Sequence, residues 1–388
     1  TCKTDTTCIN TYNRPERGAD TVVKSHTSRD QVCCSLFANS DRIAVSFPPP
    51  MTETKEFAPP SIPEGQDDPF GKGAHPLILS IQSHVVHGYV GNKAAIFPLQ
   101  LLGFHVDFIN SVQFVSQFVH KGQKMSGEEL QILFDGLEGS GHDTYTHILT
   151  GFIGQPSFLQ TVTNFVRHAK DKAAKGQRGR EVVWVCDPVL GDHGRMYVDP
   201  SLVQIYRDEV LPVADVITPN HFELQWLCKR EKVSSVEEAL ECCLELHQMG
   251  VETVVVTSMP SPTDENELIL VASSVRESRK RRRGDETASG GDGQKSVTQE
   301  DIQAFSIKFP KLPSTFYGTG DLVAAVLLAA LSKHEFRIDA ACEEALATVQ
   351  AVIGHTMGLP EKWRDLDLIG SQDLIKRPPL KFKSSRIK

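Results

Sequence analysis

The chain has 388 residues, of which 40% are hydrophobic and 23% are charged, and its formal net charge is −8. This composition predicts a globular protein with a sizeable core, and the acidic balance argues against a general nucleic-acid binder. No apolar run approaches the roughly 20 residues of a membrane span, and the start of the chain lacks the apolar core of a signal peptide. Nine cysteines without CxxC spacing favour reduced thiols. We therefore expect a cytoplasmic protein that binds neither nucleic acid nor membranes.

Residues 1–74 contain few aliphatic clusters and several Pro and Gly residues, a composition that predicts a disordered N-terminal extension. Four cysteines lie here, including the adjacent Cys33 and Cys34, and a metal site is the weaker alternative. Because Met51 is the first methionine, we hypothesise that residues 1–50 are an upstream extension. Peptides from native protein that map before Met51 would exclude this.

From Leu77 onward, strand and helix patterns alternate. We expect strands at 77–82, 106–110, 146–150, 181–186, 215–218, 253–257, 268–273 and 305–309. We expect helices at 92–102, 126–137, 157–175, 221–229, 235–249, 322–331 and 338–357, with a turn at 83–91 and capping boxes at 126/129 and 235/238. The alternation predicts one α/β domain over residues 75–375. Its fold is a three-layer α/β/α sandwich with a central, mostly parallel sheet.

Two basic stretches stand apart from that pattern. Residues 276–300 combine an arginine-rich run with a Gly-rich segment, which predicts a solvated surface loop inserted into the domain. A nuclear-localisation or nucleic-acid patch is the alternative there. The tail, residues 376–388, is also basic, and we expect it to be frayed.

A glycine loop, Tyr317-Gly318-Thr319-Gly320-Asp321, opens an almost wholly apolar helix. Free N–H groups at such a helix start favour a phosphate or an oxyanion. Asp321 is either a residue that pairs with these N–H groups or a general base beside an anion hole, and spacing alone favours the first reading.

Carboxylates also follow the expected strand 181–186. Asp187 and Asp192 are about one turn apart, which suits Mg²⁺ held through carboxylates and waters, and a loop with two solvated acids is an equal alternative. After the next strand come Thr218, Asn220 and Glu223, for which helix capping is the simpler reading.

Hydroxyl groups end a third expected strand, where Thr257 and Ser258 either donate to phosphate or begin a turn. Each of these motifs is weak alone. Because parallel strands end at one edge of a sheet, the four motifs together indicate phosphoryl transfer.

The order of these motifs resembles the ribokinase-like superfamily and, within it, the pyridoxal kinases. The resemblance runs from about Leu77 to beyond the helix after Asp321, and it rests on 80–95 (SIQSHVVHGYVGNKAA), 97–100 (FPLQ), 110–114 (NSVQF), 186–192 (CDPVLGD), 218–223 and 318–321. It implies an ATP-dependent kinase that phosphorylates the 5′-hydroxymethyl group of pyridoxal, pyridoxine or pyridoxamine. It also implies Mg²⁺, a monovalent cation (K⁺ or Na⁺) and a homodimer.

Site roles follow from the same resemblance. Asp321 would be the general base, and Gly318, Thr319 and Gly320 would form the anion hole. The residues implied for vitamer binding are Ser83, Val90, Phe114, Phe152, Tyr197 and Asp321. Those implied for ATP are Asp187, Asp192, Thr218, Asn220, Glu223, Thr257, Ser258, Thr319 and Gly320, and those implied for the metal are Asp187, Asp192 and Glu223.

The chain departs from the family on the vitamer side. The loop at 115–123, called the short loop below, is about three residues shorter than usual and lacks a His-Thr pair, and Phe152 stands where a tyrosine is common. We expect weaker vitamer binding or altered selectivity. The alternatives are a hydroxymethylpyrimidine or sugar kinase of the same fold, a non-catalytic vitamer- or nucleotide-binding protein, and a nucleic-acid binder that uses the basic insertion.

Overall fold

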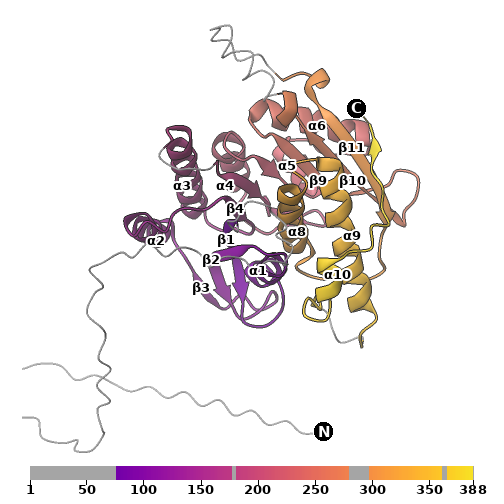
Figure 1. Cartoon of the computed structure of the whole chain (residues 1–388). Helices are drawn as coiled ribbons and strands as arrows, with labels where there is room; N and C mark the ends of the chain where they lie inside the picture. Colours follow the sequence, from indigo (N-terminus) through magenta and orange to yellow (C-terminus); the bar gives the residue numbers. More distant parts are fainter. Residues whose placement is uncertain (1–75, 177–180, 279–296, 361–364, 388) are drawn as a thin grey trace, which may run out of the picture. The chain divides into compact units, whose positions relative to one another are not determined.

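A computed structural model of the chain describes residues 76–387, apart from 177–180, 279–296 and 361–364 (Figure 1). These residues belong to one compact unit, Pro59–Lys388. The predictions for residues 1–74 and for most of the basic insertion lie outside the described residues. No helix in the described ranges is long and apolar enough to cross a membrane.

The centre of the fold is a sheet to which the described residues contribute ten strands. In spatial order they are β12 (Ser385–Arg386), β11 (Gln303–Pro310), β10 (Glu267–Ser274), β9 (Thr253–Pro260), β8 (Val216–Ile217), β5 (Val183–Cys186), β4 (His147–Thr150), β1 (Leu77–Val85), β2 (His105–Phe114) and β3 (Gly122–Lys124). The six strands from β9 to β2 are parallel, and antiparallel strands extend the sheet at both ends. The expected mostly parallel sheet is confirmed.

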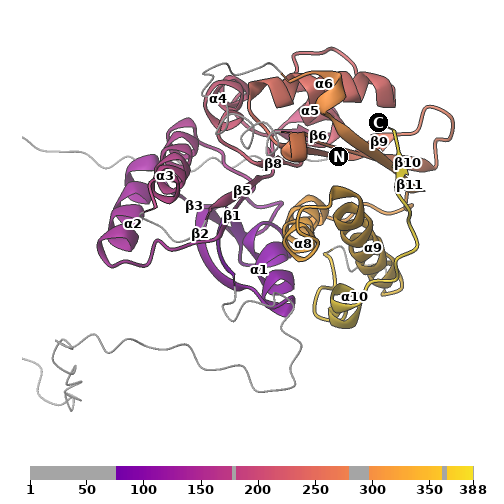
Figure 2. The same cartoon turned by 45° about the horizontal axis from the view of Figure 1, so that its top comes forward.

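Helices cover both faces of the sheet (Figure 2). The two faces have separate apolar cores. One face carries α2 (Gly127–Gly139), α3 (Pro156–Ala174), α4 (Ser201–Ile205), the π-helical turn η1 (Tyr206–Val210), α5 (His221–Leu227) and α6 (Val236–Met249). The other carries α1 (Asn92–Leu101), α8 (Thr319–Lys333), α9 (Ile338–Met357) and α10 (Gln372–Lys376). A short 3-10 turn, η2 (Gln299–Asp301), precedes β11. The three-layer α/β/α architecture is therefore confirmed.

Several predicted boundaries were wrong. β1 runs on to Val85 and β9 to Pro260, so the expected turn at 83–91 begins later and Thr257 and Ser258 lie within a strand. The capping box at Ser126 forms as predicted. At α6 only half of the predicted box forms, because the Glu238 carboxylate accepts the N–H of Ser234 (2.6 Å) rather than that of the cap residue.

The expectation of a frayed tail was also wrong. β12 pairs with β11, and the N–H of Ile387 donates to the carbonyl oxygen of Ala304 (2.8 Å). The carboxylate of Glu343 on α9 accepts from the N–H and the hydroxyl of Ser384 and from the Lys383 ammonium, each at 2.8–2.9 Å. Phe382 also packs edge-on against Phe309, and Ile387 packs against two apolar clusters, so backbone pairing, a shared carboxylate and apolar contacts together order the tail.

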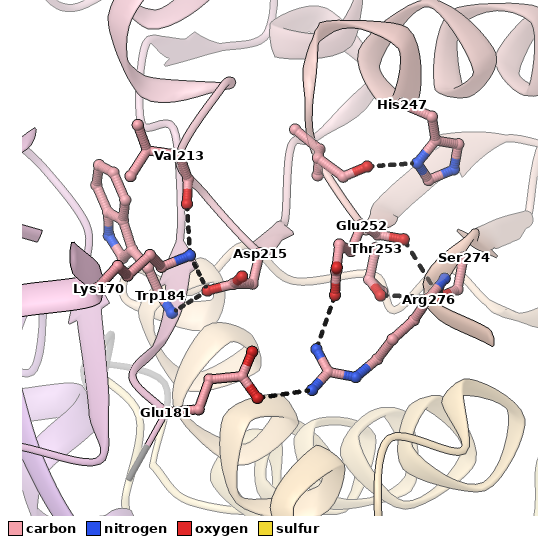
Figure 3. A network of polar contacts seen from close by, with 11 residues as sticks. Lys170, Glu181, Trp184, Val213, Asp215, His247, Glu252, Thr253, Ser274 and Arg276 are labelled. Atoms are coloured by element: carbon pink, nitrogen blue, oxygen red, sulfur yellow. Dashed lines mark hydrogen bonds and ion pairs between the residues drawn. The ribbon is translucent and has the colours of Figure 1, made fainter. Parts of the chain in front are cut away.

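Partly buried ion pairs link neighbouring segments at the edge of the sheet at which the parallel strands begin (Figure 3). Arg276 follows β10 and pairs with Glu252, which precedes β9, at 2.8 Å. The ammonium of Lys170 on α3 binds Asp215, which precedes β8, at 2.6 Å, and Asp215 accepts the N–H of Trp184 on β5 at 2.7 Å. These contacts lie at the edge where the parallel strands begin. Ligands of open α/β sheets bind at the opposite edge, where β5 and β8 end.

Candidate active site

Asp321 lies in the first turn of α8 and contacts the loop that follows β1. Its carboxylate accepts the N–H of Gly91 at 2.8 Å. Gly91 has a φ of 55°, and a Cβ at that position would lie 2.0 Å from the carbonyl oxygen and 2.5 Å from the hydroxyl of Ser83. Only glycine lets the loop descend this far onto β1. One residue therefore links Asp321, the proposed base, to Ser83.

The glycine loop packs against the same loop from the other side. Gly318 caps α8 in the left-handed region (φ 80°), and a Cβ there would lie 2.1 Å from the carbonyl oxygen of Tyr89. Two residues on, a Cβ at Gly320 would lie 3.8 Å from a carboxylate oxygen of Asp187. The start of α8, which includes Thr319 between these glycines, therefore lies between the loop after β1 and the end of β5.

Asp187 stands at the end of β5 and is buried. It accepts a hydrogen bond from the hydroxyl of Thr218 at the end of β8 (3.2 Å). Burial, followed by the charges of Glu223 and Asp321, raises the pKa of Asp187 well above its usual value. Burial likewise raises the pKa of Glu223 to about 8 and that of Asp321 above its usual value, although the Gly91 N–H partly offsets the latter. Among the described residues, three carboxylates thus lie close enough for their charges to raise the pKa of Asp187, which is an environment that would favour a nearby cation.

Glu223 and Asn220 form a capping box at the start of α5, as the simpler sequence reading predicted. The side-chain Oδ1 of Asn220 accepts the N–H groups of Phe222 and Glu223, and its side-chain amide donates to the backbone carbonyl oxygen of Gly191 (2.9 Å). The Glu223 carboxylate accepts from the N–H groups of Asn220, Leu190 and Gly191, so its oxygens are already engaged.

The expected metal residues are not gathered into one direct ligand set. Asp192 accepts the N–H of His193 (2.7 Å), and across the described ranges no three His, Cys, Asp or Glu side chains are arranged to hold a metal ion. Asp187 remains as a carboxylate that faces the glycine loop. This arrangement fits Mg²⁺, which is commonly held by one or two carboxylates, waters and substrate phosphates.

Thr257 and Ser258 lie beside the end of β8. The N–H of Thr257 donates to the carbonyl oxygen of Pro219 (3.0 Å), and the backbone of Ser258 hydrogen-bonds to the His221 side chain. Both residues therefore contact the segment between Thr218 and α5, although they lie within β9 and not at its end.

Apolar side chains gather where β1 and β2 end. Val85, Val112 and Phe114 form a buried cluster against which Val90 and Phe152 pack. Three residues for which the family resemblance implies vitamer binding, Val90, Phe114 and Phe152, thus lie together. They form an apolar patch beside Ser83, which suits an aromatic ring.

Tyr197 follows a small hairpin formed by β6 (Gly191–Asp192) and β7 (Arg195–Met196). The side chain of Tyr197 is 57% exposed. Partial burial raises the pKa of this phenol, and the charges of Asp192 and Glu223 add to the effect. Tyr197 therefore lies near Asp192 and Glu223 but on the exposed side of the site.

Sequence reasoning missed contacts made by the short loop. Gln117 donates to Asp365 (3.1 Å), a residue close to the C-terminal end of the domain, and Phe118 packs edge-on against Tyr317 with ring centroids 5.0 Å apart. No local pattern marks Asp365, because its partners lie far away in the sequence. The sequence marked this region only through its glycines, and the structure shows that Gly88 and Gly91 both adopt a positive φ.

Comparison with known proteins identifies the family. The family described as phosphomethylpyrimidine kinase matches residues 146–364. The human pyridoxal kinase is 43% identical over 289 residues, which cover 72% of this chain and 85% of the human protein. The chain belongs to the pyridoxal kinase family.

Other pyridoxal kinases support the same assignment. That of Arabidopsis thaliana is 38% identical over 320 residues, or 80% of this chain and 94% of the plant protein. The structure of pyridoxal kinase from Leishmania donovani in complex with ADP and pyridoxamine is similar with a TM-score of 0.69 and 32% identity, and the match covers 80% of this chain and 99% of that one. The chain is thus a kinase with the ribokinase-like fold of the pyridoxal kinase family.

Proposed function

We propose that this chain transfers the γ-phosphoryl group of ATP to the 5′-hydroxymethyl oxygen of pyridoxal, and also of pyridoxine and pyridoxamine. The observation that carries the proposal is the position of Asp321, which binds Gly91 above Ser83 and shares its helix turn with the glycine loop beside Asp187. A base between a ring-binding side and a phosphate-binding side is what an alcohol nucleophile requires.

The reaction follows from these positions. Asp321 takes the proton of the hydroxymethyl group while the oxygen forms a bond to the γ-phosphorus and the bond to the ADP oxygen breaks. The N–H groups of Gly318, Thr319 and Gly320 at the start of α8 stabilise the charge on the transferring group. Ser83 holds the pyridine ring, against which Val90, Phe114, Phe152 and Tyr197 pack.

The ATP side uses the ends of β5 and β8. Thr218 and Asn220, with Thr257 and Ser258 on the adjacent β9, would contact the phosphates; Asp187 would hold Mg²⁺, and Asp192 and Glu223 would support that site. The cation would neutralise phosphate charge. The carboxylates crowded around Asp187 support this placement, and also a monovalent cation, K⁺ or Na⁺, near the same phosphates.

A homodimer in the cytoplasm completes the proposal. Phe108 on β2 is 51% exposed, and in the described part of the chain β3 pairs only with residues 112–114 of that strand. An exposed phenylalanine on an open strand supports a contact with a second copy. Light scattering of the wild-type protein and of Phe108→Asp tests it. A wild-type monomer would refute the dimer.

A substrate panel tests the function. Purified full-length chain with ATP, Mg²⁺ and K⁺ is offered pyridoxal, pyridoxine, pyridoxamine, hydroxymethylpyrimidine and ribose, and ADP release is followed. Turnover should be highest on a B6 vitamer. The match to the phosphomethylpyrimidine kinase family favours hydroxymethylpyrimidine as the second candidate, and preferred turnover of it would overturn the proposal.

A further inference from the structure

Asp365 connects three segments around the vitamer side of the site. It forms a parallel bridge with Tyr317, the first residue of the glycine loop. One of its carboxylate oxygens accepts both the side-chain amide of Gln117 on the short loop (3.1 Å) and the backbone N–H of Tyr89 after β1 (3.4 Å). A single oxygen therefore holds two loops at the segment that leads into the anion hole.

The packing beneath this contact is close. Gly88 is buried with a φ of 102°, and a Cβ there would lie 2.5 Å from the side-chain oxygen of Gln117 and 2.9 Å from the Asp365 carboxylate. The two loops therefore meet with no room for a side chain between them. Among the described residues, that Gln117 oxygen is buried without a partner, so the amide is retained there by the hydrogen bond to Asp365.

The short loop is itself internally braced. The hydroxyl of Ser116 accepts the N–H groups of Phe118 (3.3 Å) and Val119 (3.1 Å), which makes a tight turn. The ring of His120 stacks on Phe114 with centroids 5.4 Å apart, and Phe114 belongs to the apolar patch beside Ser83. A displacement of Gln117 would therefore reach the surface on which the vitamer ring lies.

We propose that Asp365 is a positioning residue for the vitamer: it holds the short loop against the loop after β1 and so keeps the apolar patch in its binding shape. The inference rests on the proposed function. It gives this chain a means of fixing its vitamer side without the longer loop and the His-Thr pair that other family members have. Because Asp365 touches neither Asp187 nor Thr218 in any described contact, its effect should fall on the vitamer and not on ATP.

The test measures steady-state kinetics and direct pyridoxal binding by calorimetry for full-length Asp365→Ala, Asp365→Asn and Gln117→Ala. Asp373→Ala, an exposed aspartate on α10, is the matched control. Loss of a charge-assisted hydrogen bond should raise both KM and Kd for pyridoxal about tenfold in Asp365→Ala, while KM for ATP stays unchanged. Asparagine retains an oxygen acceptor and should restore most of the affinity. The double variant with Gln117→Ala should be no worse than Asp365→Ala alone.

Each outcome decides the question. An unchanged pyridoxal Kd in Asp365→Ala overturns the inference. An equal rise in KM for ATP, or a lower melting temperature with no rescue by asparagine, shows a merely structural role and also overturns it. If the wild-type protein binds pyridoxal but phosphorylates no vitamer, the proposed function fails, and the Kd series still decides the role of Asp365. If wild type does not bind pyridoxal, both fail.

Discussion

Asp321→Asn separates the proposed base from the structure around it. Asparagine has the same size and keeps an oxygen that can accept the N–H of Gly91, so the loop above Ser83 should hold its position. What is lost is the group that takes the proton. General-base catalysis contributes roughly 10²–10⁴ in rate, or about 3–5 kcal/mol of barrier, and we expect kcat to fall by that factor while ATP affinity is retained.

The pH profile gives a second readout of the same substitution. Burial raises the pKa of Asp321 above its usual value, and the Gly91 N–H only partly offsets this. Because the base acts when ionised, kcat in the wild-type protein should fall as the pH drops through this raised pKa. That acid limb should be absent from the residual rate of Asp321→Asn.

The assay is ADP release at saturating pyridoxal over a range of pH, with calorimetric ATP binding beside it. Asp373→Asn serves as the control, because Asp373 is an exposed aspartate on α10. A kcat for Asp321→Asn within tenfold of wild type, with the acid limb intact, would refute the assignment of Asp321 as the base.

Three further predictions test the surroundings. Gly318→Ala places a Cβ 2.1 Å from a backbone oxygen at a φ of 80°, so kcat should fall at least about tenfold and the melting temperature should drop. In the control Gly354→Ala the Cβ meets open space, and neither kcat nor the melting temperature should fall. The folded-state pKa of Asp187 lies well above its ordinary value of 3.8, so the metal-free protein should lose stability as the pH rises above 3.8. Between melts at about pH 5 and pH 8, the melting temperature of Asp187→Asn should fall less than that of the wild-type protein. Glu343→Ala should release the C-terminal tail, seen as faster amide exchange at Ser384 with kcat unchanged.

Much of the site could be predicted because parallel strands bring distant motifs to one edge of the sheet. Asp187 and Thr218 end adjacent strands and hydrogen-bond to each other, although the chain between them is long. For Asp321, the structure shows a hydrogen-bond partner that spacing could not predict. From spacing it was an N-terminal helix residue, and its actual partner, Gly91, lies on another loop.

The remaining features depend on contacts that no local pattern encodes. Asp365 acts through Gln117 and Tyr89, and nothing near it in the sequence is periodic or unusual. The tail failed as a prediction for a similar reason, because its order comes from Glu343 on α9. At α6, Ser234 and Ser235 both precede the helix, and spacing could not tell which of their N–H groups the Glu238 carboxylate would accept.

The edge of the sheet that the Arg276–Glu252 ion pair stabilises is also where the chain can accept an insertion. Ser278 donates to the carbonyl oxygen of Asp301 (2.9 Å), so the residues on either side of 279–296 meet. Val275, Val297, Ile302 and Ala304 form a small core of their own there, at the edge where the parallel strands begin. Closing a loop of twice the length costs only about 0.6 kcal/mol more. This junction is therefore a place where an engineered sensor domain can add chain length while the opposite edge of the sheet, which holds the proposed site, stays as it is.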